Sequence, residues 1–334
     1  MKLLNQKVFV LLSTCVAIYI FYHTAISKFF AYFEKVNFKE FYGFTKGNIF
    51  NFYSEIYGLN KETINNSTCF NKASLIFNTR PLCSNLKLYS SNVLSYAYYQ
   101  SARNKTYRNY ITDVINEVKS SKLYQNWSVR IYHNVNDMYN HIYDEYENLF
   151  FCDVRKTPYL GDLSNIDGMM WRFLPVGDLT VDVVCSRDLD SPILEREEDA
   201  VSYWLKSDKM SHVMRDHLMH TSSIMGGLWC IKPFKNRLLA ERLFALALSK
   251  SSRRNSKITP PYGSDQHTLN QYIWPLIKND IMIHDSYRCN GIAIPFPTKR
   301  NQSHLFVGCP RPCKIKKIQT CPVKCRKEKD WLYC

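Results

Sequence analysis

The chain has 334 residues, of which 46% are hydrophobic and 22% are charged, and it contains only 11 glycines. This composition excludes a disordered chain and allows one large α/β core or two smaller domains. The formal net charge of +15 favours polyanionic partners: nucleic acid, anionic glycans, phosphate-bearing small molecules or acidic membrane. The chain also has 12 cysteines, which is many for a cytosolic protein and raises the question of compartment.

The N-terminus predicts entry into the secretory pathway. Lys2 and Lys7 precede the apolar run Val8–Tyr22, and no acidic residue interrupts them. Residues 25–27 (AIS) would serve as a cleavage site, but residues 29–33 extend the apolar character. We therefore expect an uncleaved signal-anchor in residues 1–27 and a single-pass type II protein of the Golgi or endoplasmic reticulum membrane.

The remaining sequence fits a lumenal location. N-glycosylation sequons begin at Asn65, Asn66, Asn104, Asn126 and Asn301. In an oxidising lumen the cysteines pair as disulfides. Cys15 lies in the apolar segment, and 11 of the 12 cysteines follow it, so we expect at least one of these to be unpaired or to form an intermolecular bond.

The predicted elements start after a Phe-, Tyr- and Asn-rich stem at residues 28–68. The main domain, residues 69–308, alternates strands and helices, which predicts a largely parallel sheet with helices on both faces. In chain order we expect strand Asn92–Tyr98, helix Tyr107–Lys119, strand Val129–His133, helix Met138–Tyr146, strand Leu149–Cys152, short helix Met169–Leu174, the strand that opens Leu179–Ser191, helix Glu195–Leu205, strand His212–Met214, segment Ile224–Trp229, helices Asn236–Lys250 and Ser264–Lys278, and strand Ile281–His284.

The stretch Leu179–Ser191 carries the strongest chemical signal. Its β-branched first half predicts a buried strand, and Asp188 and Asp190 follow where that strand ends. In open α/β sheets ligands bind at the carboxyl ends of strands, and paired carboxylates suit Mg²⁺ or Mn²⁺. The alternative is a solvated turn in which Asp188 pairs with Arg187 and Asp190 caps the next helix.

Three other groups of residues can likewise be functional or structural. His284 ends an apolar strand, where it is either a metal ligand or a hydrogen-bonded core histidine. Asp265 begins a helix, where a carboxylate also stabilises the N-terminus. His217-x-x-His220 beside Asp216 resembles a fragment of a zinc site, although the chain lacks the H-E-x-x-H pattern.

The order of these motifs resembles nucleotide-sugar-dependent glycosyltransferases of the A-type fold. The resemblance covers residues 92–308, and the segments WRFLP, SRDLDS, AVSYWL, MRDH, GSDQ and HDSY are similar to poorly characterised glycosyltransferase-like proteins of invertebrates and bacteria. Two residues depart from that pattern: Leu218 replaces an expected Pro and Cys230 an expected Gly. Both departures concern the shape of the acceptor site more than donor binding.

The resemblance implies a role for each candidate. Asp188, Asp190 and His284 would hold Mn²⁺ or Mg²⁺ against the diphosphate of a nucleotide-sugar donor. Arg172 and Arg187 would neutralise phosphate or hold the acidic pair, and Gly226-Gly227 would let the acceptor approach the backbone. Asp265 and Gln266 would orient sugar hydroxyls, and in an inverting enzyme Asp265 or Asp216 would be the general base.

The tail, residues 309–334, is basic and rich in cysteine, and we interpret it as a separate, disulfide-stapled module. It either binds an anionic acceptor glycan or is a solvated face. The sequence thus predicts a cation-dependent glycosyltransferase acting on a glycan or glycoprotein. The alternative is a non-catalytic lumenal or secreted carbohydrate-binding protein of the same fold. A nucleic-acid binder conflicts with the membrane segment and the sequons.

Overall fold

The structure is a computed structural model that describes residues 82–83, 90–99, 104–136, 138, 146–158, 160–250, 263–301, 304–313 and 319–334. The expected signal-anchor and stem lie outside the described residues, as does most of the expected helix Met138–Tyr146. Within the part that is described, no helix is long and apolar enough to span a membrane. The chain divides into two compact units, and the described residues belong to the unit Arg80–Cys334.

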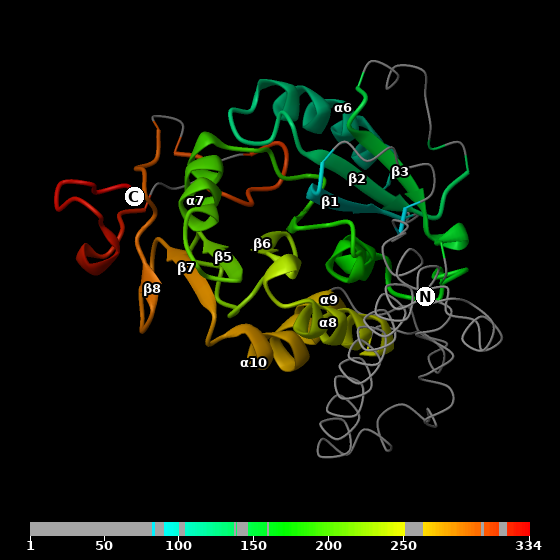
Figure 1. The fold of residues 1–334 in the computed structure, drawn as a ribbon. Coiled ribbons are helices and arrows are strands. Elements are labelled where there is room, and N and C mark those ends of the chain that lie inside the picture. Colours follow the sequence, from blue (N-terminus) through cyan, green and yellow to red (C-terminus); the bar gives the residue numbers. More distant parts are fainter. Residues whose placement is uncertain are drawn as a thin grey trace, which may run out of the picture. The chain divides into compact units, whose positions relative to one another are not determined.

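An eight-stranded mixed sheet forms the centre of this unit, with the order β3-β2-β1-β4-β6-β5-β7-β8 (Figure 1). Its strands are β1 (Asn92–Tyr98), β2 (Ser128–His133), β3 (Leu149–Asp153), β4 (Val183–Arg187), β5 (Ser211–Arg215), β6 (Leu228–Ile231), β7 (Ile281–Asp285) and β8 (Ala293–Ile294). Among these strands only β6 runs antiparallel to its neighbours. The predicted α/β fold with a mostly parallel sheet is therefore confirmed.

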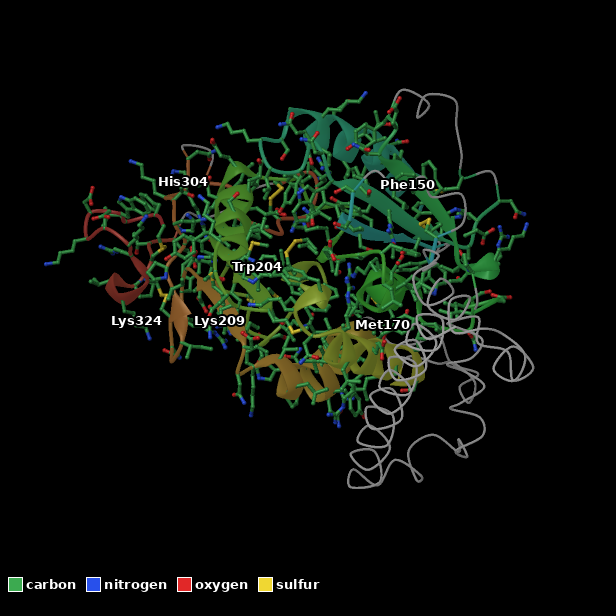
Figure 2. The ribbon with its side chains drawn as sticks, in the orientation of Figure 1. Phe150, Met170, Trp204, Lys209, His304 and Lys324 are labelled. Atoms are coloured by element: carbon green, nitrogen blue, oxygen red, sulfur yellow. A yellow bond between two sulfur atoms is a disulfide. The ribbon has the colours of Figure 1, made fainter. Side chains whose placement is uncertain are left out.

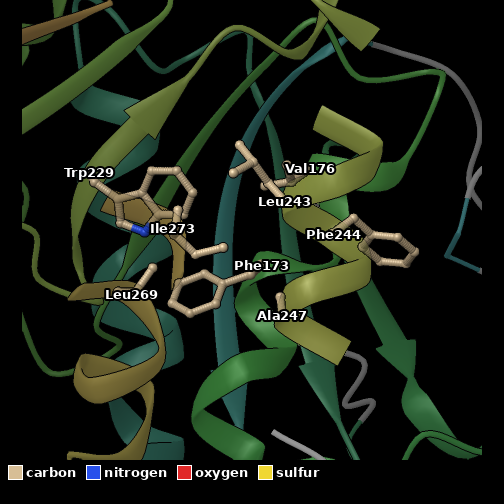
Figure 3. Close-up of a pocket in the computed structure, with 8 residues that line it drawn as sticks. All are labelled: Phe173, Val176, Trp229, Leu243, Phe244, Ala247, Leu269 and Ile273. Carbon is tan, nitrogen blue, oxygen red and sulfur yellow. The ribbon is translucent and has the colours of Figure 1, made fainter. Parts of the chain in front are cut away.

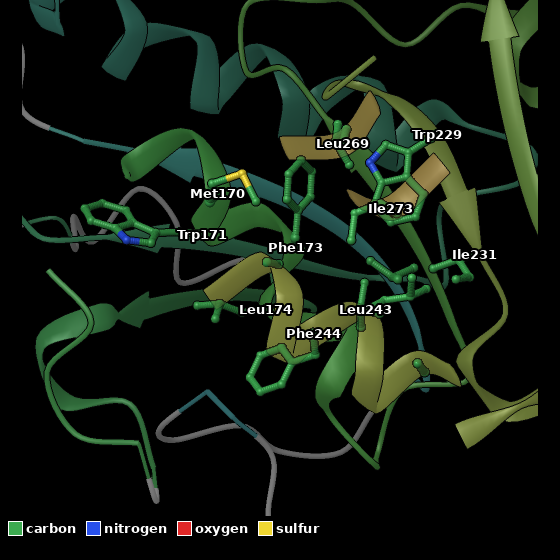
Figure 4. Close-up of a cluster of buried hydrophobic side chains, with 14 of the residues drawn as sticks. Met170, Trp171, Phe173, Leu174, Trp229, Ile231, Leu243, Phe244, Leu269 and Ile273 are labelled. Carbon is green, nitrogen blue, oxygen red and sulfur yellow. The ribbon is translucent and has the colours of Figure 1, made fainter. Parts of the chain in front are cut away.

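Helices cover both faces of the sheet because alternate side chains of each strand point to opposite sides. On one face Leu94 of β1 packs in a core with α6 (Asn104–Ser120) and α7 (Glu195–Leu205). On the other face Val93 packs with the 3₁₀ helix η3 (Gly168–Gly177) and with α8 (Arg237–Lys250). Figure 4 shows the side chains of this second core, in which η3 and α8 lie against the sheet.

The expected helix Ser264–Lys278 is divided into three pieces. They are α9 (Ser264–Thr268), the π-helical turn η5 (Leu269–Ile273) and α10 (Trp274–Ile277). Pro275 explains the division, because it has no backbone N–H to donate and its ring crowds the preceding turn. Gly263, at a φ of +91°, occupies the N-cap position of α9.

The cysteine-rich tail belongs to the same compact unit and is not a separate module. Cys325 is bonded to Cys289, which follows β7, while Cys309–Cys313 and Cys321–Cys334 close loops within the tail. The predicted stapling by disulfides is confirmed (Figure 2). Cys83–Cys152 joins the segment before the sheet to β3, Cys185–Cys230 joins the neighbouring strands β4 and β6, and no described cysteine is unpaired. Cys15 and Cys69 lie outside the described residues.

Candidate active site

The strand order reverses between β1 and β4, and open α/β sheets have their ligand-binding crevice at such a switch point. From β1 the chain proceeds to β2 and β3 on one side, and it then returns to place β4 on the other side of β1. Because β1, β4, β5 and β7 run in the same direction, the loops that follow them meet at one edge of the sheet. A reversal of strand order is the point at which open α/β sheets bind ligands.

Arg172 joins two carboxylates at this crevice. Its Nη2 donates to Oδ2 of Asp265 at 2.7 Å, and its Nη1 pairs with Oδ1 of Asp188. The side chains of Arg172 and Asp265 are 9% and 7% exposed, whereas that of Asp188 is 42% exposed. Burial would lower the pKa of Arg172, but the two carboxylates raise it above its ordinary value. Arg172 is therefore a fixed cation between a buried acid and a solvent-accessible one.

Three distant segments place these groups. Asp188 follows β4, and Asp265 lies in the first turn of α9. Arg172 lies on η3, whose first turn is capped because the side chain of Asp167 accepts from the backbone N–H of Met169 at 3.2 Å. The hydroxyl of Ser264 donates to Asp167, so η3 and α9 are joined beside the Arg172–Asp265 ion pair.

Gly226 and Gly227 lie directly against this charged group. A Cβ on Gly226 would overlap Arg172 and Asp265, and a Cβ on Gly227 would overlap the carboxylate of Asp188. No side chain fits at either position, which explains the two glycines. The predicted neighbourhood of Arg172, Asp188, Asp265 and the glycine pair is thus brought together.

Gln266 and Asn270 hold the loop that leads to the glycines. Both side-chain amides donate to the carbonyl of Ile224, from Asn270 at 3.0 Å. Oδ1 of Asn270 accepts from the backbone N–H of Ser223 at 3.0 Å. In this arrangement Gln266 positions backbone, and it contributes to the site through the loop rather than by pointing into the crevice.

No protein-family model matches the chain, and no curated protein is similar to it in sequence.

Asp188 and Asp190 offer hard oxygen ligands at the rim of the crevice. They lie in one turn, in which the carbonyl of Asp188 accepts from the N–H of Ser191 at 3.1 Å, and both residues are partly exposed. Asp190 does not cap α7, because the N-cap of that helix is Leu194. Arg172, Asp188 and Asp265 carry one positive and two negative charges, and Asp190 adds a carboxylate two residues after Asp188 along the chain. An excess of negative charge suits a divalent cation.

His284 does not join this group, which corrects its expected role as a metal ligand. Its Nδ1 lies 2.7 Å from Nε2 of His212 on β5, and its ring packs between Tyr203 and Phe296. It is 1% exposed, and burial lowers its pKa to about 3. Strands β6 and β5 separate β7 from β4, a distance of about 14 Å at the usual strand spacing. His284 is a core histidine.

Asp216 is also not suited to its predicted role as a general base. It is fully buried, its carboxylate pairs with Arg196 at 3.0 Å and Arg300 at 3.1 Å, and Oδ2 accepts from the N–H of Val307. Burial would raise the pKa of Asp216, but Arg196 and Arg300 outweigh that effect and lower it. A carboxylate with these partners anchors segments and does not accept a substrate proton.

Arg187 likewise lies behind the site rather than in it. It is fully buried and pairs with Glu197 of α7 at 2.7 Å, which compensates its charge. Its Nη1 donates to the carbonyl of Gly227 at 3.1 Å. Arg187 therefore positions the glycine pair and does not contact phosphate.

Two residues near Arg172 are not marked by any sequence pattern. Tyr99 follows β1 and packs so closely that a Cβ on Gly168 would overlap its ring. Burial raises the pKa of its phenol, and Arg172 acts in the opposite direction. Asp167 links η3 to α9, as described above. Neither residue belongs to a periodic pattern or motif, so only the fold reveals their position.

An apolar layer supports the charged group. Phe173 follows Arg172, Leu269 lies one helical turn after Asp265, and Trp229 follows the glycine pair. These side chains line a small cavity with others from η3, α8 and η5 (Figure 3). Because its lining is apolar, this cavity is part of the core and not a site for a polar ligand.

In the described part of the chain, one set of three metal-ligating side chains has its ligand atoms within 4.8 Å of one another: Asp285, Cys289 and Cys325. The two sulfurs form a disulfide, so neither is a thiolate. The carboxylate of Asp285 is already paired with Arg215 at 2.9 Å. This set stabilises the tail and offers no metal centre.

Proposed function

We propose that the chain is a glycosyltransferase that moves a sugar from a nucleotide-sugar donor to a glycan or glycoprotein acceptor, with Mn²⁺ or Mg²⁺ as cofactor. It would act in the lumen of the Golgi or endoplasmic reticulum as a type II membrane protein. The fold, an α/β sheet whose strand order reverses between β1 and β4, is compatible with the A-type glycosyltransferase fold that the motifs resemble.

One observation carries the proposal: Arg172 bridges Asp188 and Asp265 beside Gly226-Gly227 in that crevice. The excess of negative charge would repel a diphosphate on its own. A divalent cation removes this conflict, because it accepts oxygen ligands from both carboxylate and phosphate. A nucleotide-sugar is a ligand class that needs this combination.

The proposed roles follow from exposure and contacts. Asp188 and Asp190 would hold the cation, which supplies charge stabilisation for the leaving diphosphate when bound. Arg172 keeps Asp188 in position and fixes Asp265 beside the glycine pair. The buried carboxylate of Asp265 would accept a hydrogen bond from a sugar hydroxyl. Gly226 and Gly227 have no side chain, so Arg172, Asp265 and Asp188 can lie directly against the backbone.

The disulfides support the proposed compartment. Ten cysteines form five disulfides in the described residues, and this density is typical of proteins that fold in an oxidising lumen. Cys230, one of the departures from the family pattern, is bonded to Cys185 on the adjacent strand. The departure thus has a structural reason that leaves the charged group intact.

The proposal is tested with a panel of nucleotide sugars, each assayed for Mn²⁺-dependent hydrolysis. The parent chain is compared with Asp190→Asn and with the matched control Asp330→Asn, whose carboxylate is exposed on the tail. We expect one donor to be hydrolysed by the parent and the control, and at least about 100-fold more slowly by Asp190→Asn. Equal rates would contradict the metal role. Hydrolysis of no donor would favour the non-catalytic carbohydrate-binding alternative.

A further inference from the structure

The loop between β5 and β6 carries two histidines that the proposed mechanism does not use. This loop begins at Asp216, lies at the same edge of the sheet as Asp188, and leads to Gly226-Gly227. The ring of His217 stacks on Phe306 with centroids 4.3 Å apart. The ring of His220 meets both of them edge-on, at 5.7 Å.

Backbone hydrogen bonds fix the tautomer of each imidazole. The N–H of Asp216 donates to Nδ1 of His220 at 3.1 Å, and the N–H of Met219 donates to Nδ1 of His217 at 3.2 Å. A neutral imidazole has one acceptor nitrogen and one N–H. Since Nδ1 is the acceptor in both rings, Nε2 carries the hydrogen in both and is a donor.

Both imidazoles are uncharged near neutral pH. Burial lowers the pKa of His220 to about 4, and burial also lowers the pKa of His217. A protonated Nε2 on a neutral ring neither ligates a metal nor accepts a proton. His217 and His220 therefore have no free nitrogen lone pair to bind zinc, and they are not general bases.

The buried carboxylate of Asp216 holds this cluster in place. Its Oδ2 accepts from the N–H of Val307 at 3.0 Å, which sets Phe306 beside the histidine loop. Arg196 and Arg300 pair with the same carboxylate. Two segments far apart in the sequence are thus joined at one charged centre, and the two donors are held on a rigid support.

The cluster borders the candidate active site and is open to solvent. The loop that carries both histidines leads to Gly226-Gly227, against which Arg172, Asp265 and Asp188 lie. Between the two histidines, Leu218 is 44% exposed and Met219 is 76% exposed. An accessible surface that combines an aromatic ring, apolar side chains and fixed N–H donors suits a ligand with apolar faces and many oxygen acceptors. A sugar ring has both.

We propose that His217, His220 and Phe306 form the acceptor subsite, which binds an uncharged sugar ring of the acceptor glycan through the two Nε2–H donors. This inference rests on the proposed function and names the acceptor side of the same crevice. It also gives a role to the exposed Leu218, the second departure from the family pattern. Uncharged donors match hydroxyl or acetamido oxygens, whereas a sulfate would call for a cation.

The test uses the full chain on an array of neutral, sialylated and sulfated glycans. His220→Asn and His217→Asn are the informative variants, because the Asn carbonyl replaces Nδ1 as acceptor of the backbone N–H while the Nε2–H donor is lost. His267→Asn, an exposed histidine of α9, is the matched control. We expect binding to neutral glycans that falls about tenfold in each loop variant and is unchanged in the control.

Donor hydrolysis in water is measured on the same proteins and separates this inference from the proposed function. We expect the parent and the control His267→Asn to hydrolyse donor at equal rates, which shows that the donor side is intact in the protein used for the array. Array binding that is unchanged in both variants, that is confined to sulfated glycans, or that is absent in a parent chain which hydrolyses donor would overturn the acceptor subsite alone. A parent chain that hydrolyses no donor would instead contradict the proposed function.

Discussion

Arg172 illustrates how one buried cation organises a site. It contributes two hydrogen-bonded ion pairs from a side chain that is 9% exposed, and a fixed guanidinium can satisfy both carboxylates at once. Removing one member of a buried ion pair leaves the partner charged and desolvated, which costs more than the pair contributed. The coupling energy between Arg172 and Asp265 can therefore be measured by replacing one residue and then both.

We predict that Arg172→Met lowers the free energy of unfolding by about 3 kcal/mol, because Asp265 remains buried without its partner. The double variant Arg172→Met/Asp265→Asn should recover about 1 kcal/mol or more of that loss, since the unpaired charge is gone. Urea unfolding of the parent, both single variants and the double variant measures this cycle. Strict additivity of the two single effects would show that the residues are not coupled.

Gly227 yields a second prediction at this scale. In Gly227→Ala the new Cβ overlaps the carboxylate of Asp188, so that carboxylate must move by roughly 1 Å. We expect donor hydrolysis to fall by about 100-fold and the thermal unfolding midpoint to fall as well, because the new Cβ would also lie 2.9 Å from the backbone nitrogen of Asp188. Parental activity in this variant would mean that the position of Asp188 does not matter.

Single residues also show where sequence reasoning stops. Asp188 was predicted because a strand's end is visible in hydrophobic pattern, and Asp265 because a helix start is visible. His284 satisfied the same criterion, yet its strand lies beyond β6 and β5 and its ring points into the core beside His212. Strand order and the choice of face depend on long-range pairing, which no local pattern carries.

At the scale of elements, strongly periodic segments were predictable and interrupted ones were not. β1 and α7 have the expected bounds. The expected helix Ser264–Lys278 is instead interrupted by the π turn before Pro275, and that turn lies directly after the segment that carries Asp265 and Gln266. A proline inside an amphipathic pattern was the available signal.

The pair β4–β6 gives a prediction about elements. Strand β4 precedes Asp188 and strand β6 follows Gly227, and the disulfide Cys185–Cys230 joins these neighbouring strands at a sequence separation of 45. We expect Cys185→Ala/Cys230→Ala to lower the free energy of unfolding by about 2–4 kcal/mol, because the unfolded chain gains freedom. Urea unfolding measures this. Unchanged stability would show that the antiparallel pairing alone fixes the register.

For the whole molecule, buried histidines link stability to pH. The pKa of His284 is lowered to about 3 and that of His220 to about 4, and the pKa of His212 lies well below its ordinary value, in each case through burial. The folded state thus keeps these rings neutral, while the unfolded chain takes up protons near pH 6.5. The stability they contribute is present above pH 6.5 and is lost as the pH falls toward 4.

We predict that the free energy of unfolding decreases between pH 6.5 and 4, and that His220→Asn makes this slope shallower by up to about 1.4 kcal/mol per pH unit. Urea unfolding of the parent and of His220→Asn across this pH range measures both slopes. If His220→Asn does not alter the slope, the pH dependence of stability arises from groups other than His220.

The whole molecule also corrects the interpretation of the tail. Its cysteine spacing predicted disulfides, but not that Cys325 reaches Cys289 beyond β7 or that the carbonyl of Cys334 accepts from Arg196 of α7. These contacts join residues 309–334 to the same network that holds Asp216 and Phe306. Disulfide connectivity cannot be deduced from spacing alone, so the tail's attachment required the fold.

The central claim is that Asp188 and Asp190 hold a divalent cation that a nucleotide diphosphate shares. Calorimetric titration of the parent chain and of Asp188→Asn with UDP, GDP and CDP, each with Mn²⁺ or with EDTA, tests it most directly. We predict that one of the three binds the parent in Mn²⁺, and at least about tenfold more weakly in EDTA or to Asp188→Asn. Binding of equal strength in all conditions, or no binding of any diphosphate, would contradict the account.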